Sequence, residues 1–243
     1  MRIESWFTPG EVDPGALVGR TAVVIDVIRA TSVIVEALAN GARAIYPTLA
    51  PSDAVALAAT LGREDTLLCG ERRGLKVDGF DLGNSPREFQ GSVVSGQRLV
   101  MSTTNGTRAF LAAAQAARVY AAALLNLGAV AARVAEDESV AVVCAGKDGR
   151  FALDDVVCAG LLIQRVQELR GEAPSTLDES SRTAVMLARS VTPDAEFFLG
   201  TAAGAALVEI GLAEDLPVVA SLDRHALVPE MHDRMIRLSE PTV

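Results

Sequence analysis

The chain has 243 residues, of which 50% are hydrophobic and 4% aromatic, and its formal net charge is −9. This length is enough for one large buried core, and no apolar run approaches the roughly 20 residues of a membrane span. The excess of acid argues against binding to nucleic acid or to anionic membranes, which depends on basic patches.

Three cysteines without C-x-x-C spacing are typical of buried thiols in a reducing compartment. The first residues of the chain, M-R-I-E-S-W, lack the apolar stretch of a signal peptide. We therefore expect a cytoplasmic protein that does not associate with membranes.

The first part of the chain alternates between strand and helix patterns. Residues 21–28 form a continuous β-branched run, which predicts a buried parallel strand. The pattern continues as a helix over 30–40, a strand over 42–47, a helix over 52–61 and a strand over 66–70.

Residues 71–85 form a long loop that is rich in glycine and charge and has no periodicity. The loop ends at Ser85-Pro86-Arg87-Glu88, a capping box with proline at the first helical position. Because long unstructured loops in compact domains are usually functional or disordered, this sharp ending favours a functional loop.

The alternation resumes after this loop. We predict strands over 99–102, 119–124 and 140–144, and helices over 107–116, over 127–136 with Asn126 as cap, and over 155–169 with Asp154 as N-cap. Residues 180–210 are helical with breaks near Pro193 and Gly200, and short strands follow at 218–221 and 235–238. The strand–helix order predicts an α/β fold with a mostly parallel sheet, a more helical C-terminal part and a single domain over 1–243.

Polar clusters follow four of the predicted strands, at the edge where ligands bind in parallel sheets. They contain Asp26 and Arg29; Glu71, Arg72 and Lys76; Ser102, Thr103, Thr104, Asn105, Gly106 and Thr107; and Lys147, Asp148, Arg150, Asp154 and Asp155. Helix capping and dipole compensation alone can account for at least one of the last two acids. Convergence of all four clusters on one edge predicts a binding site.

The segment 102–107 joins an apolar strand to an alanine-rich helix. The first turn of a helix has unpaired N–H groups and the positive end of the macrodipole, so hydroxyls, an amide and a glycine placed there can hold a phosphate or sulfonate. The alternative is that Thr104 or Asn105 only caps the helix and Gly106 eases the turn.

Several known motifs are absent, including the P-loop, the dinucleotide fingerprint and the nucleophile elbow. The two lysines, Lys76 and Lys147, both lie in polar loops near glycine, where a compact ammonium group could be required. With no histidine near the clusters, carboxylate-bound Mg²⁺ is a better prediction than zinc. Carboxylates, cations and an anion cradle together are what phosphate-ester chemistry needs.

Five segments in chain order resemble the 2-phosphosulfolactate phosphatase family: V-I-D-V-I-R-A-T at 24–31, G-E-R at 70–72, G-F-D-L-G-N-S-P at 79–86, S-T-T-N-G-T at 102–107, and C-A-G at 144–146 with F-x-L-D-D at 151–155. The resemblance implies a three-layer α/β/α fold. It also implies Mg²⁺-dependent hydrolysis of (2R)-O-phospho-3-sulfolactate to 3-sulfolactate and phosphate, a step in coenzyme M biosynthesis.

We hypothesise a phosphatase acting on that ester or on a related small anionic one. Asp26, Arg29 and Glu71 are the expected catalytic residues, and Asp26, Glu71, Asp154 and Asp155 the expected metal ligands. Arg29 and residues 102–107 would hold the phosphoryl group, and Arg72, Lys76 or Lys147 would meet a sulfonate or carboxylate. Two alternatives remain, a non-catalytic anion-binding protein and a Mg²⁺-dependent isomerase or lyase that stabilises an enolate. The sequence leaves open a homo-oligomer.

Overall fold

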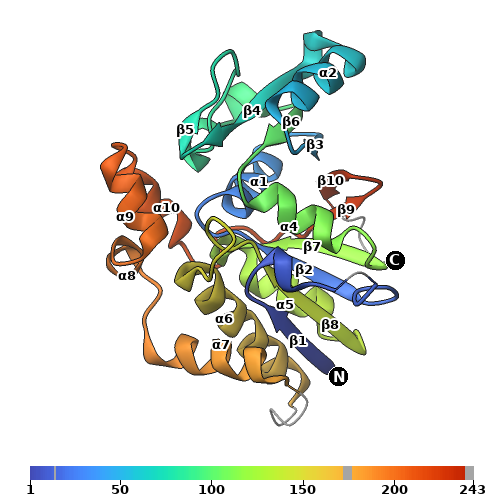
Figure 1. Cartoon of the computed structure of the whole chain (residues 1–243), viewed down its shortest axis with the longest axis vertical. Helices are drawn as coiled ribbons and strands as arrows, with labels where there is room; N and C mark the ends of the chain where they lie inside the picture. Colours follow the sequence, from blue (N-terminus) through green and yellow to red (C-terminus); the bar gives the residue numbers. More distant parts are fainter. Residues whose placement is uncertain (14, 172–176, 239–243) are drawn as a thin grey trace.

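A computed structural model describes residues 1–13, 15–171 and 177–238, which fold around a ten-stranded sheet (Figure 1). The strands lie in the order β1 (Arg2–Trp6), β8 (Ser139–Cys144), β2 (Thr21–Ile25), β7 (Arg118–Ala122), β9 (Pro229–His232), β10 (Met235–Leu238), β3 (Ala44–Pro47), β6 (Arg98–Ser102), β4 (Thr66–Arg72) and β5 (Leu75–Lys76). The predicted α/β fold with a mostly parallel sheet is confirmed.

The sheet consists of two parallel groups joined by an antiparallel hairpin. The first group is β1, β8, β2 and β7, and the second is β3, β6 and β4. Between them lie β9 and β10, so three successive antiparallel pairings separate β7 from β3. The two groups therefore run in opposite senses across the hairpin, and only a strong twist of the sheet can bring their carboxyl ends together.

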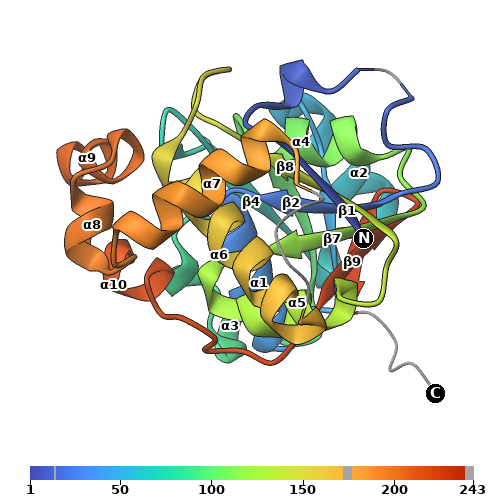
Figure 2. The same ribbon diagram turned by 90° about the horizontal axis from the view of Figure 1, so that it is seen from below.

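Helices α1 (Ala30–Ala39) and α4 (Gly106–Ala113) lie between the two groups of strands (Figure 1). One buried cluster contains apolar side chains from both helices and from both groups. The opposite face of the first group is covered by α5 (Leu127–Val134), α6 (Leu153–Arg170) and α7 (Glu179–Ser190), which stand in front of the sheet in Figure 2. This is the expected three-layer α/β/α arrangement.

The remaining helices lie at the edges of this core. Helix α2 (Pro51–Leu61) packs on the outer face of the second group, and α3 (Gly91–Val94) precedes β6. Helices α8 (Ala195–Leu199), α9 (Ala202–Glu209) and α10 (Leu216–Val219) lie together beside the carboxyl ends of the first strand group (Figure 1), and their larger buried side chains belong to the core cluster of that group. No helix in the described ranges has the length and apolar character needed to cross a membrane.

The buried β2 strand and the breaks in the C-terminal helices follow the sequence closely. All five residues of β2 are buried, because a continuous β-branched run suits a strand covered on both faces. The helical segment 180–210 is confirmed as α7, α8 and α9, with breaks at the positions of Pro193 and Gly200.

Other local predictions were wrong. Residues 218–221, predicted as a strand, overlap α10, which has Pro217 in its first turn. Helix α6 starts earlier than expected, with Ala152 as N-cap and Asp154 and Asp155 inside its first turn. The capping box at 85–88 is present but opens only a single 3-10 turn, Pro86–Glu88. Asn126 does occupy the N-cap position of α5 as predicted, but its side-chain oxygen accepts from the Ala123 N–H and not from an N–H of the helix.

Strands β1 and β9 were missed, and β5 lies inside the predicted loop. All three are short, and β1 alternates charged with buried residues at the edge of the sheet. Such short strands, two of them at the edges of the sheet and β9 inside it, carry little apolar signal, so pairing with a neighbour decides them.

Candidate active site

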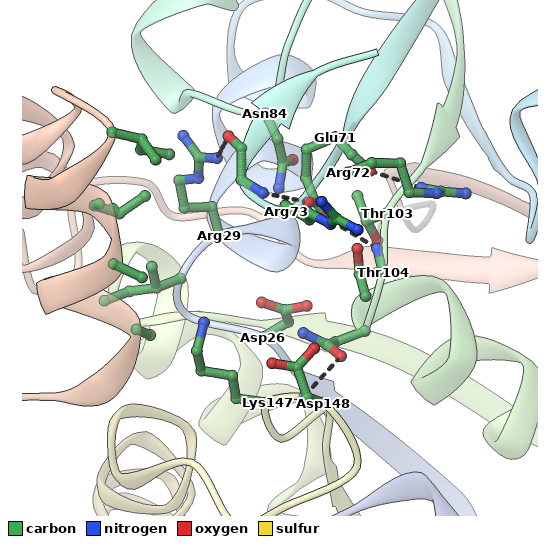
Figure 3. A pocket seen from close by; sticks show the side chains of 17 residues that line it. Asp26, Arg29, Glu71, Arg72, Arg73, Asn84, Thr103, Thr104, Lys147 and Asp148 are labelled. Atoms are coloured by element: carbon green, nitrogen blue, oxygen red, sulfur yellow. Dashed lines mark hydrogen bonds between the residues drawn. The ribbon is translucent and has the colours of Figure 1, made fainter.

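A cavity of about 780 Å³ lies between the carboxyl ends of the two strand groups (Figure 3). The first group contributes the segments after β2 and β8, the second contributes those at the ends of β4 and β6, and α9 closes a further side with apolar side chains. The polar residues that line it are Asp26, Arg29, Glu71, Arg72, Arg73, Asn84, Thr103, Thr104, Asn105, Lys147 and Asp148.

The structure brings eight of the sequence-predicted site residues to this cavity: Asp26, Arg29, Glu71, Arg72, Thr103, Thr104, Asn105 and Lys147. Ser102, Gly106 and Thr107 are buried directly behind its lining, and Asp154 and Asp155 are buried in the first turn of α6. Lys76 is exposed on β5 and does not line the cavity.

Asp26 is the first residue of the turn between β2 and α1. Its main-chain carbonyl accepts from the N–H and the hydroxyl of Thr31, and Ser32 donates its hydroxyl to Val27. The Oδ1 atom of Asp26 accepts from the Ala30 N–H at 3.2 Å. No described residue donates a hydrogen bond to Oδ2, so one carboxylate oxygen stays open to the cavity.

The loop after β6 is closed by reciprocal hydrogen bonds between Thr103 and Thr107. The Thr107 N–H donates to the Thr103 hydroxyl at 3.2 Å, and the Thr103 N–H donates to the Thr107 hydroxyl at 3.3 Å. The Asn105 side-chain oxygen accepts from the Asp148 N–H. The Thr104 hydroxyl is buried and has no partner in the described part of the chain, so a ligand could supply one.

Helices α1 and α4 begin side by side at the cavity. A Cβ on Gly106 would lie 2.5 Å from the Ala30 Cβ and 2.7 Å from Asp26 Oδ2, so this contact requires a residue without a side chain. Two helix N-termini therefore direct their positive dipole ends at the same region, which favours an anion there.

Glu71 joins the end of β4 to the loop after β6. Its two carboxylate oxygens accept from the N–H groups of Gly74 at 2.8 Å and Thr104 at 2.7 Å. Its neighbour Arg72 donates to the carbonyls of Leu49, Glu71 and Ser102 and to the Ser102 hydroxyl. Both side chains thus hold the walls of the cavity in place.

Arg29 forms a buried ion pair that the sequence did not reveal. Its guanidinium donates to Asp215 Oδ2 at 2.9 Å and to the Gly74 carbonyl at 2.6 Å, and Asp215 also accepts from the Ser85 hydroxyl at 2.5 Å. Arg29 is 3% exposed and Asp215 is fully buried, so neither charge is compensated by water. The pair ties the start of α1 to the segment that precedes α10.

A family model described as 2-phosphosulpholactate phosphatase matches residues 6–234. The chain belongs to the 2-phosphosulfolactate phosphatase family. A probable 2-phosphosulfolactate phosphatase of Deinococcus radiodurans is 42% identical over 86% of this chain and 87% of its own length. A protein with the same description from Thermus thermophilus is 43% identical over 87% of this chain and 88% of its own length. Another from Clostridium perfringens is 37% identical over 99% of this chain and 97% of its own length.

Membership of this phosphatase family makes the chain a phosphoric monoester hydrolase and confirms the resemblance seen in its motifs. It favours hydrolysis over the two alternatives, an anion sensor and an enolate-forming enzyme. The family assignment does not say which residues of the cavity act on the ester.

The acids of this phosphatase site are buried and affect one another. Burial, together with the charges of Asp154 and Glu71, raises the pKa of Asp26 to about 7, although the Ala30 N–H and Arg29 oppose the rise. Burial raises the pKa of Asp154 to about 6, and Lys147 opposes it. Burial and the neighbouring Asp154 and Asp26 carboxylates raise the pKa of Asp155 well above its usual range. Such mutually raised values are typical of functional sites.

Three residues at or beside the site were missed from the sequence: Arg73, Asn84 and Asp215. Asp148, which belongs to the predicted polar cluster after the strand over 140–144 but was given no role, also lines the cavity. Asn84 lies inside the family-like segment 79–86, so that segment carried a usable signal. Asp215 lies far along the chain from Arg29, and no local pattern could pair the two.

Proposed function

We propose that this protein is a Mg²⁺-dependent phosphatase that hydrolyses 2-phosphosulfolactate, or a related small anionic phosphoester, to an alcohol and phosphate. One observation carries the proposal: the open oxygen of Asp26 faces the same cavity as the 103–105 loop and the adjoining N-termini of α1 and α4. The printed descriptions of the relatives support the choice of substrate.

In this reaction the phosphoryl group would lie against the 103–105 loop, where Thr104 has a free hydroxyl and α4 presents its N-terminus. Asp26 would then attack phosphorus or orient the attacking water. With water as the attacking group, its oxygen bonds to phosphorus as the ester P–O bond breaks, and its proton passes to the leaving oxygen to form the alcohol. With Asp26 as the attacking group, the ester P–O bond breaks to give an aspartyl phosphate and the alcohol, and water then hydrolyses the aspartyl phosphate to release phosphate and the free carboxylate. Because the loops around the site are already hydrogen-bonded, little reorganisation is needed as charge develops on the phosphoryl oxygens.

The donor set of the cavity fits Mg²⁺ held by few protein ligands. No group of three or more metal-binding side chains is found in the described ranges. Glu71 and Asp155 use both carboxylate oxygens on backbone N–H groups, which leaves Asp26 as the first ligand, with Asp154 beside it. Mg²⁺ commonly takes only one or two carboxylates and completes its shell with water and phosphate oxygens. When bound it would offset negative charge on the phosphoryl group.

We also propose a cytoplasmic location. Cys69, Cys144 and Cys158 are free and buried, as expected for thiols kept in a reducing compartment.

The test is release of inorganic phosphate from a panel of esters, comprising 2-phosphosulfolactate, 2-phospholactate and isopropyl phosphate, with and without Mg²⁺. We expect the protein to release phosphate from the anionic esters. A chelator should abolish this release, and added Mg²⁺ should restore it. Full activity in chelator would refute the metal dependence, and no release from any ester would refute the proposed reaction.

A further inference from the structure

The cavity contains a guanidinium that the structure leaves unpaired. Arg73 lines the cavity, and no residue in the described ranges forms an ion pair or hydrogen bond with its side chain. Its backbone is left-handed, with φ of 54°, a conformation that is uncommon for residues other than glycine. The Glu71 carboxylate holds this turn through the Gly74 N–H. A strained and anchored turn therefore carries a free cation at the cavity (Figure 3).

Asn84 provides an independent observation on the same segment. It is only 5% exposed and lines the cavity, and no described residue accepts a hydrogen bond from its carboxamide nitrogen. Its neighbours are fixed, since the Gly83 N–H donates to Glu88 and the Ser85 hydroxyl donates to Asp215. Figure 3 shows the nitrogen end of the carboxamide directed into the cavity. A carboxamide N–H without an acceptor is unfavourable in a buried side chain, and an anion in the cavity would supply that acceptor.

The other cations near the cavity do not offer the same contact. Arg29 is paired with Asp215, and Arg72 donates to three carbonyls. Lys76 is exposed on β5 outside the lining, and Lys147 lies on the side of the cavity occupied by Asp26 (Figure 3). Arg73 and Asn84 are thus the free donors on the wall formed by residues 71–85.

We propose that Arg73 and Asn84 form a subsite for the second anionic group of the substrate, its sulfonate or carboxylate. The planar guanidinium and the carboxamide N–H can each donate to the same anion. This inference rests on the proposed function, because the subsite selects the group that is not hydrolysed. It makes the enzyme selective for phosphoesters that carry a second negative charge.

The kinetic test compares Arg73→Ala with Lys76→Ala, which removes the same charge from the same segment outside the cavity. For 2-phosphosulfolactate we expect Arg73→Ala to lower kcat/KM by about 10- to 100-fold, chiefly through KM, because a hydrogen bond to a charged group is lost. For isopropyl phosphate, which has no second anion, we expect a change within about twofold. The loss on 2-phospholactate, which keeps only the carboxylate, shows which of the two anions the subsite binds.

Two further variants test Asn84. Asn84→Asp keeps the shape of the side chain but places a like charge against the anion, so it should reduce kcat/KM for 2-phosphosulfolactate more than Asn84→Ala does. Melting temperatures separate this effect from misfolding. Equal losses on isopropyl phosphate and 2-phosphosulfolactate, or equal losses in Arg73→Ala and Lys76→Ala, would overturn the proposal.

Direct binding separates this subsite from the hydrolysis itself. Calorimetric titration with 3-sulfolactate should show binding to the unmodified protein and to Lys76→Ala, and at least about tenfold weaker binding to Arg73→Ala. Equal binding to all three proteins would refute the subsite even if phosphate is released. If no ester is hydrolysed, the proposed function fails, and the titration still decides the subsite.

Discussion

The two walls of the cavity differ in how their charged groups are used. The wall from the first strand group contains Asp26 and, behind it, Asp154 and Asp155, which are buried and have raised pKa values. The wall from the second group contains one carboxylate, Glu71, whose oxygens both accept backbone N–H groups. Its other polar residues in the lining are arginines, threonines and the amides Asn84 and Asn105.

This difference separates two roles. Buried acids with an open oxygen suit a metal or an attacking group, whereas a wall of fixed donors suits recognition of an anion. The Arg29–Asp215 pair joins the walls, because it connects the start of α1 to the Gly74 turn and to Ser85. The following substitutions test the separation, beginning with the largest expected effect.

Asp215→Ala removes the partner of a buried arginine. We expect a loss of about 3–5 kcal/mol in the free energy of unfolding, because the Arg29 charge would stay buried without compensation. Denaturant titration measures this. The matched control is Glu214→Ala, which breaks the exposed ion pair with Arg87 and should cost about 0–1 kcal/mol. Similar losses in the two variants would show that the pair does not join the walls.

Asp26→Asn keeps the size of the side chain and removes its charge from the acidic wall. We expect kcat to fall by about 100-fold or more, as on removal of other preorganised groups. Phosphate release and melting temperature are measured together. Asp78→Asn, an exposed acid of the 71–85 segment, serves as control. A folded Asp26→Asn enzyme with near-normal kcat would exclude Asp26 from the chemistry.

Gly106→Ala acts where the two walls meet. The added Cβ would lie 2.5 Å from the Ala30 Cβ, so α1 and α4 must separate. We expect a cost of about 1–3 kcal/mol in stability, as for other overpacked contacts, together with a lower kcat. Gly91→Ala, whose added Cβ would meet only ordinary contacts at 3.7 Å, is the control for both measurements. A Gly106→Ala protein as stable and active as the control would contradict this contact.

Arg72→Ala tests the donor wall against its neighbour Arg73. Arg72 donates to backbone carbonyls and a hydroxyl, so we expect a stability loss of about 1–2 kcal/mol and little change in preference among phosphoesters. Arg73→Ala should do the reverse, leaving the melting temperature unchanged and altering substrate preference. A selective rise in KM for 2-phosphosulfolactate in a fully stable Arg72→Ala protein would reverse these two roles.

The amino-acid sequence determined the parts of this protein that depend on neighbouring residues. The β-branched run of β2, the polar segment 102–107 ahead of α4 and the breaks at Pro193 and Gly200 were all predictable, because periodicity and capping act within a few residues. The order of strands and helices likewise predicted the fold class and the edge at which polar clusters gather.

Tertiary structure decided which charged groups are paired and which are free. Arg29 pairs with Asp215, which lies 186 residues away in the sequence. Arg73 lines the cavity, whereas Lys76 does not. Strand β10 coincides with the strand predicted over 235–238, but the place of the β9–β10 hairpin between the two strand groups was outside the reach of local patterns, as was the helical state of residues 216–219. Each depends on which distant surfaces pack together, because burial and pairing set the energy of a charge or a short strand more than its own neighbours do.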